Sequence, residues 1–147
     1  MSGEKGIDML DLSSEWGKHA EQRLRSDKVA WLTTVGSDGR PYTVPVWFLW
    51  EGDSVLFFSQ PNKQKVRNLR KNVRVTLAID DTKGGDDVVI VEGTAELLDD
   101  QDVSTTLPEY VEKYRTMIQD LGYTPETMGA DFSLAIRITP TKIRNWA

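Results

Sequence analysis

Apolar and polar residues alternate over several short runs of this chain, and this period of two predicts β-strands. Such runs occupy residues 29–35, 42–50, 54–59, 73–79, 88–98 and 132–146. The alternation is clearest in the fourth run, where one face is expected to carry Val73, Val75, Leu77 and Ile79. Tight turns at Asp38-Gly39 and at residues 51–53 join the first three runs, which predicts an antiparallel meander.

Four other segments have the spacing or the end signals of helices. Residues 14–26 begin at a serine cap and place on one face Trp16, Ala20 and Leu24. Residues 62–71 predict a short helix, and residues 99–121 predict a long helix that is irregular near Pro108. The apolar side of the long helix is expected to carry Tyr110, Tyr114, Met117 and Ile118. A further turn begins at residues 124–126, with threonine as its cap and proline in its first position.

These elements predict the fold class. Six strands with few helices close more readily into a barrel than into an open sheet, because a barrel leaves no long unpaired edges. We therefore expect a mainly β fold, a six-stranded antiparallel barrel. The chain has no internal repeat, low-complexity segment or interdomain linker. Residues 1–147 are therefore expected to form a single domain, with residues 1–12 as a flexible tail.

The composition narrows the function classes. The 147 residues are 39% hydrophobic and 28% charged, which excludes global disorder. A net charge of −5 argues against a nucleic-acid partner. The absence of cysteine excludes disulfides, thiolate catalysis, Fe–S clusters and cysteine-based zinc sites. The single histidine, His19, builds no multi-histidine metal site and is expected on a helix surface, and no Ser/His/Asp arrangement is evident.

The ends and the hydropathy of the chain bear on its location. The first residues lack an apolar core of signal-peptide length, and no run of 18 apolar residues occurs. The expected location is therefore cytoplasmic, with no membrane partner.

A basic segment at residues 59–72 contrasts with the acidic chain around it. Lys63 and Lys65 fall in the first turn of the predicted short helix, where the free N–H groups already make the helix end positive. Lysines in that position favour a bound anion, usually a phosphate. Helical spacing also places Lys63, Arg67 and Arg70 roughly along one side. The alternative interpretation is a basic helix face that is simply solvated.

The second strand contains Val44-Pro45-Val46-Trp47. A proline within a strand cannot donate to a neighbouring strand, so it marks an edge or a break in pairing. The backbone groups around Pro45 and Val46 are then free to bind a flat heteroaromatic ring with an O=C–N–H edge. The alternative is an ordinary edge strand, with Trp47 in the core or at an interface rather than in a pocket wall.

The order and spacing of several short motifs resemble those of the pyridoxamine-phosphate-oxidase-like superfamily of FMN-binding split β-barrels. The motifs are Asp-Gly-Arg-Pro, Val-Pro-Val-Trp-Phe, Phe-Phe-Ser, Lys-Val-Arg-Asn-Leu and Asn-Val-Arg-Val-Thr-Leu, and they start at positions 38, 44, 57, 65 and 72. Within the superfamily, the chain is similar to the group B flavin/deazaflavin oxidoreductases that use coenzyme F420, whose last strand resembles residues 137–146. The resemblance covers residues 28–146.

This resemblance implies a split barrel that forms a homodimer with two cofactor sites at the subunit interface. It implies that the cofactor ring lies against Val44, Pro45, Val46 and Trp47. It also implies that the phosphate region is held by Ser59, Lys63, Lys65 and Asn68. Lys65 occupies the matching position of the Lys-Val-Arg-Asn-Leu motif. Near the ring, the partner subunit is expected to supply Arg144 and Trp146.

The function that the resemblance implies is that of an F420-dependent oxidoreductase, which transfers a hydride between the deazaflavin and a small unsaturated organic substrate. Such a cofactor carries the hydride chemistry, so the protein needs no strong acid or base, and solvent or a tyrosine would supply the proton. One alternative is an FMN-dependent oxidoreductase of the same superfamily. Another is a non-catalytic protein that binds a flavin or a tetrapyrrole.

Overall fold

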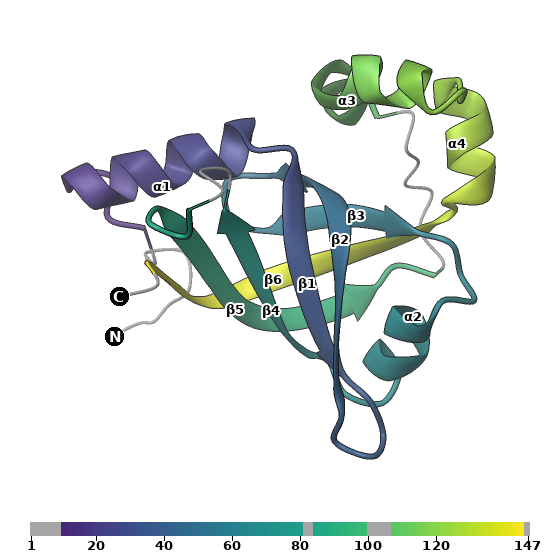
Figure 1. The fold of residues 1–147 in the computed structure, drawn as a ribbon, viewed down its shortest axis with the longest axis horizontal. Helices are drawn as coiled ribbons and strands as arrows, with labels where there is room; N and C mark the ends of the chain where they lie inside the picture. The colour runs from purple at the N-terminus through teal and green to yellow at the C-terminus, as the bar shows by residue number, and fades with distance from the viewer. Residues whose placement is uncertain (1–9, 81–83, 100–106, 146–147) are drawn as a thin grey trace.

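Six antiparallel strands close into a barrel in the order β1-β2-β3-β6-β5-β4 (Figure 1). The computed structural model describes residues 10–80, 84–99 and 107–145. In chain order the elements are α1 (Glu15–Ser26), β1 (Val29–Val35), β2 (Pro41–Trp50), β3 (Val55–Ser59), α2 (Gln64–Leu69), β4 (Arg74–Asp80), β5 (Val88–Leu97), α3 (Pro108–Asp120), α4 (Pro125–Asp131) and β6 (Leu134–Asn145). The predicted mainly β fold and its six-stranded barrel are confirmed.

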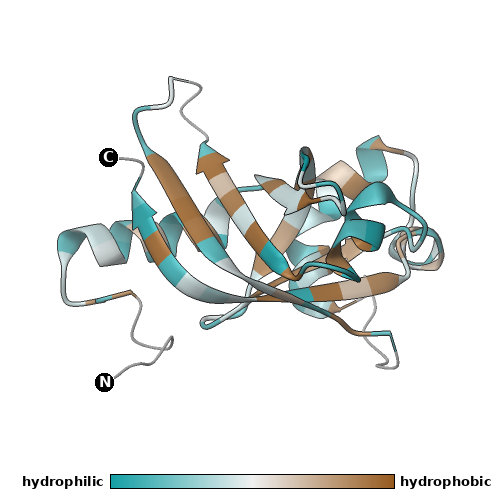
Figure 2. Ribbon diagram, turned by 90° about the horizontal axis from the view of Figure 1, so that it is seen from below, coloured by the Kyte–Doolittle hydropathy of each residue, from teal (hydrophilic) through white to brown (hydrophobic). Residues whose placement is uncertain are grey.

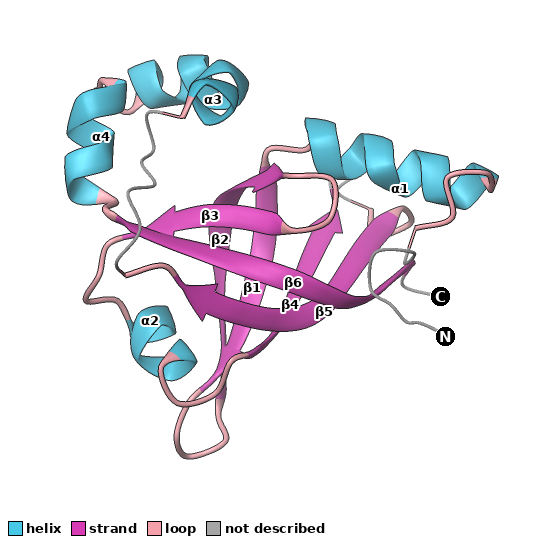
Figure 3. Cartoon of the chain, turned by 180° about the vertical axis from the view of Figure 1, so that it is seen from behind, coloured by secondary structure: helices cyan, strands magenta, loops and turns pink. Residues whose placement is uncertain are grey.

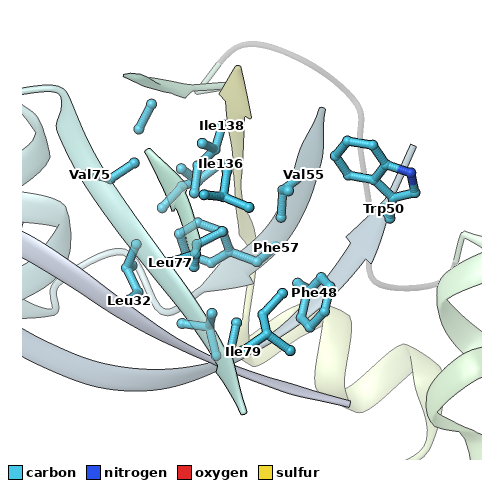
Figure 4. Packing of buried hydrophobic residues seen from close by; sticks show 14 of the residues in the cluster. Leu32, Phe48, Trp50, Val55, Phe57, Val75, Leu77, Ile79, Ile136 and Ile138 are labelled. Atoms are coloured by element: carbon cyan, nitrogen blue, oxygen red, sulfur yellow. The ribbon is translucent and has the colours of Figure 1, made fainter. Parts of the chain in front are cut away.

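The inward face of each strand supplies the core. Apolar colour concentrates in the strands, whereas helices and loops are mostly hydrophilic (Figure 2). Side chains from opposite sides of the barrel meet in its centre, among them Leu32, Phe48, Phe57, Leu77 and Ile136 (Figure 4), and all five are fully buried. The alternation seen in the sequence therefore reports the direction of each side chain, into the barrel or away from it.

The barrel is split between β2 and β3. Residues 41–47 of β2 pair with β1, but only residues 48–50 pair with β3. Beyond Phe57, β3 pairs with β6 alone. The first part of β2 therefore has one edge that no described strand covers.

Pro45 and Trp47 direct their backbone groups toward this uncovered edge. Backbone N–H and C=O groups alternate in direction along an antiparallel strand. The carbonyl of Arg40 accepts from the β1 side (2.8 Å), and the N–H of Glu51 donates to the β3 side (2.8 Å), so the odd-numbered residues of β2 face the split. Val46 instead pairs with β1. Because proline has no N–H, Pro45 leaves no donor unpaired there, and the predicted break in pairing is confirmed.

Gly93 marks a bulge where β5 meets β6. The register of the two strands shifts between Glu92 and Gly93. A Cβ atom on Gly93 would lie 2.4 Å from the carbonyl oxygen of Thr139. Only glycine permits this close approach of the two backbones, so the bulge is fixed by the sequence.

The helices cover different parts of the barrel (Figure 3). α1 lies at one end, and α2, α3 and α4 lie toward the other. Ala20 and Leu24 of α1 are fully buried in the barrel core. The helices α3 and α4 instead form a second apolar cluster with the outer side of β3 and β6: Leu56, Phe58, Leu98, Tyr110, Tyr114, Ile118, Met128 and Ala135.

Two predicted boundaries are wrong. The helix expected over 99–121 begins at Pro108, because proline fits the first helical position, and Asp99 lies in a turn. Residues 100–106 are outside the described part. Val73 precedes β4 and is 44% exposed, so it does not belong to the inward face as predicted. The side chain of Asn72 accepts from the N–H of Arg74, the residue at which β4 begins.

Candidate functional site

A cavity of about 210 Å³ lies at the split in the barrel. Its walls come from β2, β3, α2 and the α3–α4 region, and they are lined by Pro45, Val46, Trp47, Phe58, Lys65, Tyr110, Leu121, Met128 and Phe132. Four of the residues predicted from the sequence meet here: Pro45, Val46, Trp47 and Lys65. A mostly apolar hollow with few polar groups is the usual form of a small-molecule site.

Lys65 is the charged residue of this cavity wall. Its side chain is half-buried, and its ammonium group has no ion pair or hydrogen bond with any described residue. Burial, and then the neighbouring charge of Lys63, lowers the pKa of Lys65. A half-buried cation without a counter-ion is unfavourable, so the site favours an anion.

Lys63 stands beside Lys65 at the start of α2. It is the N-cap residue, its side chain makes no capping bond, and the first turn contains no acidic residue. Lys63 is exposed and does not line the cavity. The charge of Lys63 contributes to the lowered pKa of Lys65, after burial, so the two lysines act on the same part of the structure.

The side chain of Tyr114 of α3 lies between the ends of β1 and β2. Its hydroxyl accepts from the N–H of Phe48 (2.7 Å) and lies within donating distance of two carbonyls, those of Lys28 (2.7 Å) and Phe48 (2.8 Å). Its ring stacks on Trp47, with centroids 4.9 Å apart and planes inclined by 6°. Tyr114 therefore holds the strand segment that forms the cavity wall.

Three other predicted residues lie away from the cavity wall. Ser59 is fully buried, and its hydroxyl donates to the carbonyl of Gln60 (2.7 Å). Asn68 is buried and donates to the hydroxyl of Thr34 (2.9 Å). Val44 packs against the barrel core. The contacts of these residues with a cofactor stay predictions.

Arg144 lies on the outer surface of β6, away from the cavity of its own subunit. Its Nε atom pairs with Glu92 on the adjacent strand (3.1 Å). Its expected role at the site of a partner subunit stays a prediction. Trp146, expected to act beside it, lies outside the described residues.

The sequence did not identify the residues that α3 and α4 bring to the cavity. Tyr110, Leu121, Met128 and Phe132 come from a segment that the sequence could not place in space. Of the predicted stripe, Tyr110, Tyr114 and Ile118 are buried, as expected, and Met117 is half-buried. The sequence feature that pointed to a special role for this stripe is its two tyrosine hydroxyl groups, because a buried tyrosine usually needs a polar partner.

A second, basic hollow of about 350 Å³ lies along α2, lined by Ser37, Gln64, Arg67, Asn68, Arg70 and Lys71. Arg67 donates to the carbonyl of Asn62 (2.7 Å) and to Gln64 (2.8 Å). Arg70 forms a two-point pair with Asp99 (2.8 and 3.2 Å). The predicted line of positive charge is therefore partly neutralised within the protein.

Lys113 lies at a wider hollow of about 950 Å³ beside α3. Its ammonium group donates to the carbonyl of Phe48 (2.8 Å) and lies 4.0 Å from the centre of that residue's ring. Burial, helped by the charge of Lys28, lowers the pKa of Lys113 from 10.5 to about 8.

This shift predicts a pH dependence of stability. Between pH 8 and 10.5 the unfolded chain holds a proton that folded Lys113 has lost, so stability gains from rising pH in this window. The free energy of unfolding of wild-type protein should therefore rise from pH 8 to pH 10 relative to that of Lys113→Met. Urea denaturation at several pH values measures the difference. A constant difference across the window would contradict the assignment.

No group of three or more His, Cys, Asp or Glu residues within 10–80, 84–99 and 107–145 lies close enough to hold a metal ion. His19 lies on the surface of α1, as predicted, and contacts Asp87 (2.8 Å). In the part of the chain that the structure describes, no helix is long and apolar enough to span a membrane.

Solved structures share this fold. The chain is similar to an F420 reductase, with 25% identity, a TM-score of 0.64, and coverage of 85% of this chain and 95% of that one. It is similar to a putative pyridoxamine 5'-phosphate oxidase from Listeria innocua, with 22% identity, a TM-score of 0.67, and coverage of 90% and 98%. It also resembles HutZ, a heme storage protein from Vibrio cholerae, with 16% identity, a TM-score of 0.63, and coverage of 87% and 92%.

No curated protein matches the chain in sequence. The family model described as pyridoxamine 5'-phosphate oxidase, however, matches residues 17–147. That range includes all six strands, the split between β2 and β3, and the cavity that the split creates. The chain therefore belongs to the pyridoxamine 5'-phosphate oxidase family.

Proposed function

We propose that this protein is an oxidoreductase that uses coenzyme F420 to transfer a hydride to or from a small unsaturated organic substrate. The observation that carries the proposal is Lys65, a half-buried cation with no partner among the described residues, at the wall of the cavity beside the uncovered edge of β2. A phosphorylated ring cofactor would satisfy both features at once.

The cavity fits the parts of such a cofactor. Pro45 offers a carbonyl at the uncovered edge and Trp47 offers an N–H, which complement the O=C–N–H edge of a flavin-type ring. The phosphate would take the charge of Lys65, with Lys63 beside it. When bound, the cofactor supplies the hydride chemistry. The protein's own residues orient the ring and neutralise its tail.

Two observations favour coenzyme F420 over FMN, the first alternative. The F420 reductase is similar to this chain at 25% identity. The basic hollow along α2 also suits the longer anionic tail of the deazaflavin, although Asp99 already neutralises part of the charge of Arg70. FMN needs the same ring edge and one phosphate, so it differs from F420 mainly along that hollow.

The second alternative is a non-catalytic tetrapyrrole-binding protein, a function suggested by the likeness to a heme storage protein. The cavity lining contains no histidine. The one histidine of the chain, His19, lies on α1 and contacts Asp87. Haem with an imidazole ligand from this chain therefore does not fit the cavity.

The proposal is tested by titrating purified protein with coenzyme F420 and with FMN while recording fluorescence quenching. We expect tighter binding of F420, followed by oxidation of its reduced form when cyclic enones or quinones are added. Tight FMN binding without F420 binding would refute the choice of cofactor. F420 binding without turnover of any such acceptor would favour a binding protein.

We also propose that a second copy of the chain packs on the outer face of β1. The strand register lines up outward-facing residues from four strands: Pro45 of β2, Trp31 of β1, Ala78 of β4 and Ile90 of β5. Trp31 is 49% exposed at the centre of this surface, which we name the Trp31 face. Because Pro45 belongs both to this face and to the cavity wall, a partner seated there would adjoin the cavity.

Trp31→Glu is expected to convert the dimer to monomer. Loss of a buried tryptophan from the centre of an interface typically costs at least about 2 kcal/mol, which is a rise of about 30-fold in the dissociation constant. Light scattering across a dilution series measures it. Leu12→Glu is the control, since Leu12 is also exposed but precedes α1. A monomeric wild-type protein, or a dimeric Trp31→Glu variant, would refute the interface.

A further inference from the structure

Tyr110 of α3 has a buried hydroxyl with no partner among the described residues. The residue is only 3% exposed and lines the cavity at the split. Its ring packs edge-on against Phe58, with centroids 5.0 Å apart, and at a tilt against Tyr114, at 4.9 Å. These contacts fix the ring but give the hydroxyl nothing to bond.

The hydroxyl of Tyr110 differs from that of Tyr114 in having no hydrogen-bond partner among the described residues. The two tyrosines lie one helical turn apart on the same face of α3, yet the hydroxyl of Tyr114 has three backbone partners. Buried polar groups in folded proteins are nearly always hydrogen-bonded, so an unbonded hydroxyl at a cavity wall is a position where the occupant of the cavity supplies the partner. Burial also raises the pKa of Tyr110, so the hydroxyl keeps its proton and acts as a donor.

We propose that the hydroxyl of Tyr110 donates a hydrogen bond to a carbonyl oxygen of the ligand that occupies the cavity. The inference rests on the proposed function and adds a selection for carbonyl compounds to it. Lys65 is the cavity's charged side chain and suits the anionic part of a ligand. Tyr110 lies among Phe58, Met128 and other apolar groups, where a neutral acceptor is the better match.

Two carbonyl groups are candidates for the acceptor of this hydrogen bond, one on the cofactor ring and one on the substrate. In the first arm of the test, wild-type protein and Tyr110→Phe are titrated with whichever of F420 and FMN binds more tightly. In the second arm, carbonyl-labelled cyclohex-2-enone is added to each protein saturated with the oxidised cofactor, and its C=O stretching frequency is recorded. Tyr42→Phe is the matched control, because it removes a hydroxyl outside the cavity.

The expected result is a change in one arm. A loss of affinity of about three- to tenfold in Tyr110→Phe assigns the bond to the ring carbonyl. A lowered C=O frequency in wild-type protein that is lost in Tyr110→Phe assigns it to the substrate. Wild-type cofactor binding with no change in either arm overturns the role of Tyr110 alone. Wild-type protein that binds neither cofactor overturns this inference and the proposed function together.

The ligand-free protein gives an independent check. Since the hydroxyl of Tyr110 has no described partner, Tyr110→Phe should leave the melting temperature unchanged or slightly raised. A melting temperature lowered as far as that of Tyr114→Phe would show that the hydroxyl is already bonded in the free protein. That result would overturn the inference.

Discussion

Lys65→Ala is expected to weaken binding of a phosphorylated cofactor by about 10- to 150-fold, because a charge-assisted hydrogen bond contributes roughly 1.5–3 kcal/mol. The same change should not destabilise the ligand-free protein. Lys65 has no described partner to lose, and its lowered pKa shows that burial disfavours its charge. Fluorescence titration gives the affinity, and thermal unfolding gives the stability.

A pair of ligands separates the charge from the ring contacts. Riboflavin carries the ring of FMN without its phosphate, so Lys65→Ala should weaken FMN binding and leave riboflavin binding nearly unchanged. Lys18→Ala removes an equal charge from α1, on the far side of the barrel from α2, and should alter neither affinity (Figure 1). Equal losses for FMN and riboflavin would show that Lys65 supports the ring or the cavity shape rather than the phosphate.

The strands and turns were predictable from the sequence because their signals are local. The period-two pattern assigns the inward side chains, and Gly39 and Gly52 adopt the positive φ that their turns need. Pro45 marked the uncovered edge for a similar reason, since a missing N–H has a local consequence whatever the rest of the fold. These features placed one wall of the cavity.

The opposite wall could not be predicted, because it depends on packing between distant segments. The helical stripe that includes Tyr110 would look the same against any apolar surface, and Met128 shows no local sign of lining the same cavity as Lys65. The ion-pair partner of a charged surface residue also comes from a distant segment of the chain. The sequence gives no sign that Asp99 would neutralise Arg70. The basic residues along α2 therefore predicted more unpaired positive charge than the folded helix carries.

The two walls of the cavity lie together because side chains of α3 stack on and hydrogen-bond to β2. Trp47 contributes its strand edge to the cavity while its ring stacks on Tyr114. Lys113, the residue of α3 just before Tyr114, donates to the carbonyl of Phe48. The α3 helix therefore reaches the cavity with Tyr110 and holds the strand edge with Tyr114, so stability and binding are coupled through one helix face.

Tyr114→Phe is expected to lower the free energy of unfolding by about 2–4 kcal/mol, because each buried polar group left without a partner costs roughly 1–3 kcal/mol. The change removes one oxygen and leaves the N–H of Phe48 without its acceptor. It also removes the donor shared by the carbonyls of Lys28 and Phe48, although Lys113 still bonds the latter. Urea denaturation of both proteins measures the loss.

The matched control is Tyr110→Phe, which removes the same atom from the same helix face one turn earlier. If the loss in Tyr114→Phe came from general loosening of α3, both variants would be destabilised alike. If it comes from the backbone bonds of Tyr114, only that variant loses stability. Its cofactor affinity should also fall, because Trp47 stacks on the Tyr114 ring and carries the backbone groups that face the cavity. An unchanged free energy of unfolding in Tyr114→Phe would mean that water replaces the hydroxyl. The backbone bonds of Tyr114 would then not be what holds α3 against β2.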